Sequence, residues 1–207
     1  MSETDVIPRE DTQEARRDRD RVRLKKVALR HGTALLAALT LWGASDYWAT
    51  GSGLVLAEVV SWFNAVFAGT AIAYLVHEWG HFAGARLSGS VSPVMKEPAS
   101  FFMFSFKYEQ NSREQFLSMS LGGPIANWSL VILLCFLLPL ETWSQALLLA
   151  TTFAIAVSVS VFEVPVINRV LYGDDPQVII EQRRNGAGTT PTKVGIVAGA
   201  LLWLLIA

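Results

Sequence analysis

The sequence predicts an all-α membrane protein, a polytopic helical bundle of about five transmembrane helices with a short interfacial β-hairpin or strand. Of the 207 residues, 52% are hydrophobic and only 17% are charged, a balance typical of chains that cross a bilayer. The apolar residues gather in separate runs, each near the roughly 20 residues that a helix needs to cross the hydrocarbon core. The runs lie near residues 31–50, 57–85, 115–140, 144–168 and 194–207. The last run is short, so a half-inserted helix is the alternative there.

The chain begins with a charged leader, residues 1–28, and continues as a membrane-embedded domain over residues 29–207. The mixed charges run too long before any apolar stretch for a secretory signal, so we expect a solvated, partly helical cytoplasmic leader. Its basic run from Arg16 to Lys26 can touch anionic lipid of the bilayer, whereas the acidic residues among them argue against nucleic-acid binding. With Cys135 as the single cysteine, a disulfide framework is excluded.

The basic residues predict the orientation. All 17 Lys and Arg lie in three segments: nine between Arg9 and Arg30, four between the second and third apolar runs, and four between the fourth and fifth. The two remaining connections carry none. The positive-inside rule therefore places the N-terminus and both basic connections in the cytoplasm.

The second apolar run ends in the motif His-Glu-x-x-His. His77 and His81 stand four residues apart, so on a helix they share a face and can both ligate one metal ion. Zinc accepts imidazole nitrogens in tetrahedral geometry with one position left for water, and Glu78 can act on that water as general base. The motif predicts one zinc ion per chain. The alternative is a structural cluster of polar groups that satisfy one another.

The depth of the motif favours function. If Arg86 marks the cytoplasmic interface, His81 lies about 7.5 Å inside it at 1.5 Å per helical residue. Ionisable side chains at such depth are expensive and indicate a functional site.

The third apolar run contains a second unusual stretch, "SLGGPIANW". Small residues such as Gly123 let another backbone approach closely, Pro124 frees a carbonyl, and Asn127 offers a carboxamide inside an apolar helix. The simpler interpretation is small-residue helix packing with a satisfied asparagine.

The two motifs together, His77-Glu78-x-x-His81 and then Gly123-Pro124-x-x-Asn127 on the next span, resemble the site-2 protease family of intramembrane zinc metalloproteases. The resemblance covers about residues 57–182. It implies that the first motif supplies two zinc ligands and the base, that the second lines the active-site groove with Asn127 as an oxyanion or backbone contact, and that an aspartate on a third segment completes the zinc site.

The family cleaves membrane-anchored substrates within or next to a transmembrane segment, to release regulators or to trim signal-peptide remnants. The resemblance therefore implies a small member without a PDZ domain, in the bacterial inner membrane, with a membrane-protein or signal-peptide substrate and an unidentified membrane partner. Between the motifs, Phe102, Phe104 and Phe106 alternate after two prolines, a pattern typical of a strand. Phe104 would then present an edge strand to an unwound substrate, or anchor the loop at the interface.

The third zinc ligand is where this chain departs from the family pattern. Phe162 stands where the family has asparagine, and Asp174-Asp175-Pro176 replaces Asp-Gly. We predict Asp174 as the ligand, because a proline and a glycine before it can break the helix and return the chain. Asp175 would cap the following helix or orient a histidine.

Glu163 is the competing ligand. It lies six residues inside Arg169, about 9 Å, a depth that matches the histidines. A glutamate ligand would indicate a membrane zinc protease of another family, such as a prenyl-protein protease. A third possibility is a non-catalytic membrane scaffold that binds a partner and holds no metal.

Overall fold

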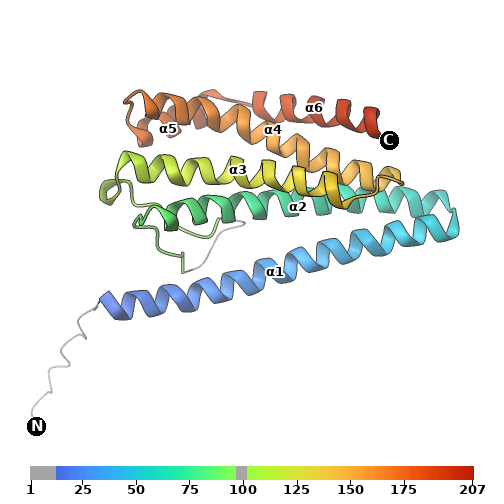
Figure 1. Cartoon of the computed structure of the whole chain (residues 1–207), viewed down its shortest axis with the longest axis horizontal. Helices are drawn as coiled ribbons and strands as arrows, with labels where there is room; N and C mark the ends of the chain where they lie inside the picture. The colour runs from blue at the N-terminus through green and yellow to red at the C-terminus, as the bar shows by residue number, and fades with distance from the viewer. Residues whose placement is uncertain (1–12, 97–101) are drawn as a thin grey trace, which may run out of the picture.

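The computed structural model describes residues 13–96 and 102–207, and Figure 1 shows its long helices α1, α2, α3, α4 and α6 running side by side. Short α5 lies at the end where α1 begins. The predicted all-α class is confirmed. The elements are α1 (Gln13–Ser52), α2 (Val55–Leu87), η1 (Tyr108–Gln110), α3 (Arg113–Leu137), α4 (Trp143–Leu171), α5 (Pro176–Gly186) and α6 (Thr190–Ile206).

Fewer helices can cross a membrane than the sequence predicted. By length and composition, α2, α3 and α4 qualify among the described residues, and α5 with α6, bent by 69°, makes a fourth if counted as one span. The predicted five spans therefore become three or four. The apolar run of α1 contains polar residues such as His31 and Asp46, and α6 has only 17 residues, the lower end of the range for a crossing.

The predicted interfacial hairpin is not confirmed. Within the described residues, the segments on either side of 97–101 meet through one antiparallel bridge, between Val94 and Phe104, and no β-strand forms. Pro93 has no N–H to donate, and the Met103 amide donates to the Glu78 carboxylate at 2.9 Å instead of to the facing segment. The ladder therefore stops after one bridge.

The predicted leader is continuous with the first apolar run, because α1 passes through residue 28 without a break. Residues 1–12 of the leader lie outside the described residues. The leader half of α1 is docked on the rest of the chain through Asp20, which pairs with Arg86 of α2 and accepts a hydrogen bond of 2.6 Å from the Val94 amide.

Glycines bring α2 and α3 into backbone contact. A Cβ on Gly80 would lie 2.3 Å from the carbonyl oxygen of Gly122, and one on Gly84 would lie 2.2 Å from that of Ser118. Only residues without a side chain permit this approach. It sets the histidine-bearing face of α2 directly against α3.

Candidate metal centre

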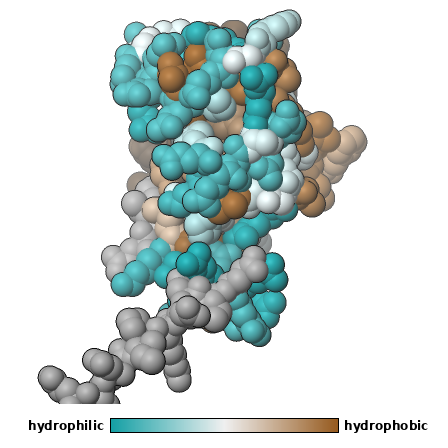
Figure 2. All heavy atoms as spheres, turned by 90° about the vertical axis from the view of Figure 1, so that its left-hand side faces the viewer, coloured by the Kyte–Doolittle hydropathy of each residue, from teal (hydrophilic) through white to brown (hydrophobic). Residues whose placement is uncertain are grey.

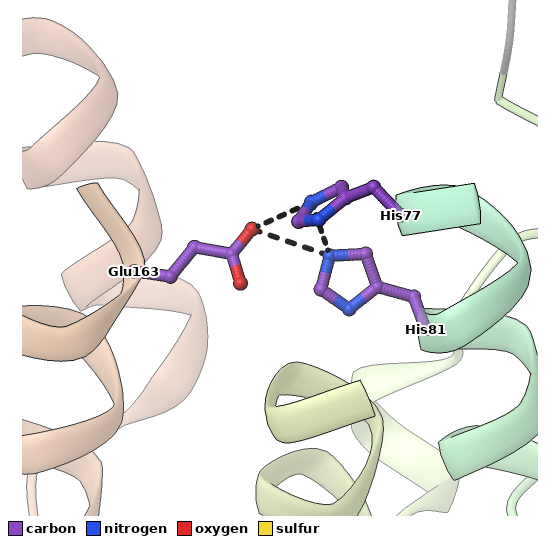
Figure 3. A group of neighbouring side chains, drawn as sticks. All are labelled: His77, His81 and Glu163. Atoms are coloured by element: carbon purple, nitrogen blue, oxygen red, sulfur yellow. Dashed lines mark hydrogen bonds and ion pairs between the residues drawn. The ribbon is translucent and has the colours of Figure 1, made fainter. Parts of the chain in front are cut away.

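His77 and His81 of α2 converge with Glu163 of α4, as Figure 3 shows. The two Nε2 atoms lie 2.9 Å apart. One carboxylate oxygen, Glu163 Oε1, lies 2.9 Å from Nε2 of His77 and 3.2 Å from Nε2 of His81. These three side chains can hold a metal ion, which confirms the predicted metal site in its coarser form.

The donor set fits zinc. Donors bonded to tetrahedral zinc at 2.0–2.1 Å lie about 3.3 Å from one another, so the three atoms need to move apart by less than about 0.5 Å. The other oxygen of Glu163, Oε2, is buried and has no hydrogen-bond partner among the described residues. A buried carboxylate oxygen without a protein donor is expensive, and a cation would compensate it.

The opposite nitrogen of each imidazole is oriented by α3. His81 Nδ1 lies 2.8 Å from the carbonyl oxygen of Met119, which can only accept, so this nitrogen carries the proton and Nε2 keeps its lone pair for a metal. Asn127 Nδ2 lies 3.4 Å from Nδ1 of His77, while its buried Oδ1 has no partner among the described residues. If the Asn127 amide is rotated by 180°, its oxygen accepts a hydrogen bond from His77 Nδ1. Both histidines then carry their proton on Nδ1 and keep the Nε2 lone pair for a metal.

Gly123 provides the room for both rings. A Cβ at this position would lie 2.5 Å from Cε1 of His81 and 2.6 Å from Cε1 of His77. The following Pro124 lacks an N–H, so the carbonyl of Ser120 one turn earlier has no helical donor, and Ser120 lines a cavity that His81 also lines. The "GGPIAN" stretch therefore shapes the site as well as packing the helices.

Glu78 lies beside the three possible ligands without joining them. Its side chain is buried, its Oε1 accepts the Met103 amide, and it faces a cavity of about 340 Å³ that His81 and Glu163 also line. Aromatic side chains form much of the cavity wall: Phe102, Phe104, Phe106, Tyr108, Phe116 and Phe162.

The segment of Phe104 and Phe106 presents backbone groups beside this cavity. Ser105 and Lys107 donate to the facing segment, to Pro93 and Val91, so Phe104 and Phe106 point their N–H and C=O groups the other way. No hydrogen bond to another described residue uses these groups.

Tyr108 follows the same segment and lines the same cavity. Burial raises the pKa of Tyr108 above its ordinary value, against the opposing effect of Arg184, so its hydroxyl stays protonated and can donate.

Glu163 lies at a point of α4 where proline interrupts the helical hydrogen bonds and a side chain of α5 replaces the missing donor. Pro165 has no N–H, which leaves the carbonyl of Val161 without its helical donor. Arg183 of α5 supplies a donor instead, at 2.8 Å from the Val161 oxygen and 3.4 Å from that of Phe162. In the sequence, Glu163 lies between the residues that carry these carbonyls and Pro165.

Asp174 and Asp175 do not join the histidines. Asp174 accepts a hydrogen bond of 2.6 Å from Arg169 and its side chain is 45% exposed. Asp175 caps α5, with Oδ1 2.9 Å from the Gln177 amide. Both line a separate hollow. Gly173, with φ of 113°, turns the chain between α4 and α5, but this turn lies beyond the end of α4 and leaves Asp174 outside the group that can hold a metal.

Sequence reasoning missed three contacts: the Met103 amide on Glu78, the Met119 carbonyl on His81, and Arg183 on α4. Only the last had a sequence signal, because a proline inside an apolar run frees a carbonyl that needs a donor. Comparison with protein-family models, with curated proteins and with solved structures finds no match to this chain.

Proposed function

We propose that the protein is an intramembrane zinc metalloprotease of the kind that the two sequence motifs resemble, with His77 and His81 as ligands and with Glu163 in place of the aspartate that the resemblance implied. The observation that carries the proposal is the convergence of three donor atoms within about 3 Å of one another, on helices apolar enough to cross a membrane, with a second acidic residue, Glu78, beside them. Such a set of donors has little use in a bundle that only needs to pack.

Glu78 is the proposed general base. A bound zinc ion would supply Lewis-acid activation of a water molecule and of the scissile carbonyl. Glu78 takes the proton of the attacking water and returns it to the leaving amine as the peptide bond breaks. Its hydrogen bond from the Met103 amide fixes one carboxylate oxygen, so the other is available for this proton.

The proposed substrate is an extended stretch of a membrane-anchored protein or a signal-peptide remnant. A helical peptide bond is shielded by its own side chains, so the substrate must unwind before cleavage. The outward backbone groups of Phe104 and Phe106 offer an unwound stretch an edge to pair with, next to the cavity that Glu78 lines. The aromatic wall suits apolar substrate side chains.

The test combines cleavage with zinc content. We expect wild-type protein to cleave tagged single-pass membrane proteins co-expressed with it, and Glu78→Gln to lower the rate roughly a hundred- to ten-thousandfold while one zinc per chain remains bound. Zinc content should fall to nearly zero in His77→Ala and stay near one ion per chain in Asp174→Ala. Undiminished cleavage by the Glu78→Gln variant would disprove the mechanism, and a wild-type protein that holds no zinc would favour the non-catalytic scaffold.

Glu163 also favours a second candidate, a zinc protease of another family that cleaves prenylated proteins. A glutamate on a later helix supplies the third ligand in this alternative, and Glu163 occupies that place here. Prenylated C-terminal peptides, offered to the same purified protein, separate the two. Cleavage of these peptides, together with no cleavage of membrane spans, would select the second candidate.

We further propose a bacterial inner-membrane location with the N-terminus in the cytoplasm. Figure 2 shows that hydrophilic side chains cover much of the end where α1 begins, and Figure 1 shows that the described parts of the three basic segments lie at this end. Cysteines introduced at Ser88 and Asn185 should resist an impermeant thiol reagent added to intact cells. A cysteine at Gly53, at the opposite end, should react readily, and the reverse pattern would invert the orientation.

A further inference from the structure

A groove of about 740 Å³ lies between the first turns of α1 and the loop that follows α2, apart from the candidate metal centre. Its basic side chains come from both walls, while one acidic side chain, Asp18, lines it among the described residues. The basic side chains are Arg19, Arg23, Lys26 and Arg30 from α1 and Lys96 from the loop.

The four basic residues of α1 share one face. Their spacing of four, three and four residues is that of a single stripe along a helix. Like charges at such spacing repel one another, so the stripe weakens the helix unless an anion lies against it. Lys96 adds a fifth positive charge from across the groove.

The described acidic residues leave part of this charge, that of Lys26 and Lys96, without an ion-pair partner. Asp20 is engaged outside the groove, with Arg86 and with the Val94 amide. Arg23 donates to the carbonyl oxygen of Val94, a neutral group, at 3.3 Å. Lys26 and Lys96 make no ion pair with an acidic side chain among the described residues.

The groove also lies at a change of character along α1. Arg30 is the last basic residue of the helix. Exposed apolar side chains lie on both sides of it: Leu29 directly before it is 74% exposed, and Leu36 after it is 68% exposed. Within the groove, Val27 is buried and Val22 exposed, so its surface is partly apolar. A ligand that combines a negatively charged head with a hydrocarbon chain matches both parts.

We propose that this groove binds the phosphate headgroup of an anionic phospholipid, with the acyl chains following the apolar half of α1. The basic residues contact the phosphate oxygens, and arginine can do so through paired N–H groups. The site fixes the leader half of α1 at the membrane surface. It does not depend on zinc or on proteolysis.

The test uses the full chain in a mild non-ionic detergent, with short-chain phosphatidylglycerol as probe and phosphatidylcholine as the neutral comparison. We expect Lys26→Gln/Arg30→Gln to weaken phosphatidylglycerol binding about tenfold or more. The matched control is Arg21→Gln/Lys25→Gln, which removes the same charge at the same spacing outside the groove and should change binding less than about twofold. Lys96→Gln, on the loop, should weaken binding severalfold without altering α1.

Two results would overturn the proposal. Equal weakening by both double variants would mean that the charge attracts lipid diffusely, without a site. Binding of inorganic phosphate that matches the lipid, or that displaces it at equal concentration, would assign the groove to a soluble phosphate compound. Unchanged thermal unfolding and zinc content in every variant establish that the fold is retained.

Discussion

Two polar clusters of the bundle, the candidate metal centre and a group around Asp46 toward the opposite end, differ in how protein atoms satisfy their hydrogen bonds. At the end away from the metal centre, the Asp46 carboxylate of α1 accepts from three side chains. Thr142 donates to Oδ1 at 2.9 Å, Ser61 to the same oxygen at 3.4 Å, and Gln145 to Oδ2 at 3.3 Å. Both carboxylate oxygens have donors, so this cluster ties α1, α2 and the start of α4 together.

The metal-centre cluster is arranged in the opposite way. Glu163 faces two imidazole nitrogens with one oxygen, and its other oxygen is buried without a partner among the described residues, as is Oδ1 of Asn127. Hydrogen-bond donors surround the carboxylate of Asp46, whereas at the candidate metal centre the carboxylate of Glu163 faces imidazole nitrogens that can act as acceptors. A carboxylate surrounded by hydroxyl and amide donors, such as that of Asp46, is structural, whereas one that shares its space with imidazole lone pairs is suited to a cation.

The largest difference should appear when each carboxylate is removed. Glu163→Ala takes away a proposed ligand, so zinc content should fall from the expected one per chain to nearly zero. Asp46→Ala leaves three donors without an acceptor, so the free energy of unfolding should fall by roughly 1–3 kcal/mol while zinc stays bound. Zinc analysis and thermal unfolding of the two purified variants measure both effects. Zinc loss in Asp46→Ala at a temperature where it remains folded would contradict this contrast.

A smaller effect should follow from the asparagine beside His77. Asn127→Leu keeps the volume but removes the group that orients the imidazole, so zinc affinity should fall about 10- to 100-fold, measured by competition with a chelator. Asn64→Leu is the matched control, because Asn64 bonds Ser45 and Leu41 far from the site. If both variants bind zinc as tightly as wild type, Asn127 serves packing alone.

The contrast between local and distant contacts explains what could be predicted from sequence. His77, Glu78 and His81 lie within five residues on one helix, and helical geometry alone places the two histidines on one face. Each apolar run falls largely on one helix for the same local reason, although the third run ends three residues beyond α3 and the fifth ends one residue beyond α6. Glu163 meets His81 across 82 residues, and the sequence left it in competition with Asp174. Helix packing brings Glu163, and not Asp174, to the histidines, because α4 lies against α2 over the depth of the histidines and the turn after α4 lies beyond it.

The smallest predicted loss of zinc affinity concerns Arg183, which compensates the break at Pro165. Its guanidinium donates to the freed carbonyl of Val161 at 2.8 Å and lies 5.8 Å from the ring centroid of Phe162. We expect Arg183→Gln to lower the free energy of unfolding by about 1–3 kcal/mol, since a carbonyl inside the bundle loses a charged donor. Zinc affinity should fall severalfold, because Glu163 loses part of its support. Arg169→Gln, which breaks the exposed pair with Asp174, should cost at most about 1 kcal/mol and leave zinc unchanged.

A double-mutant cycle with Pro165→Ala isolates the physical cause of the Arg183 effect. Alanine restores the N–H that proline lacks, so the Val161 carbonyl regains its helical donor and no longer depends on Arg183. Arg183→Gln should therefore destabilise the Pro165→Ala protein less than the wild type, with a coupling energy of roughly 0.5–3 kcal/mol. Thermal unfolding of the four proteins measures this difference. An equal loss in both backgrounds would mean that Arg183 stabilises α4 through the Phe162 ring or its charge, and that the break at Pro165 is satisfied by another group.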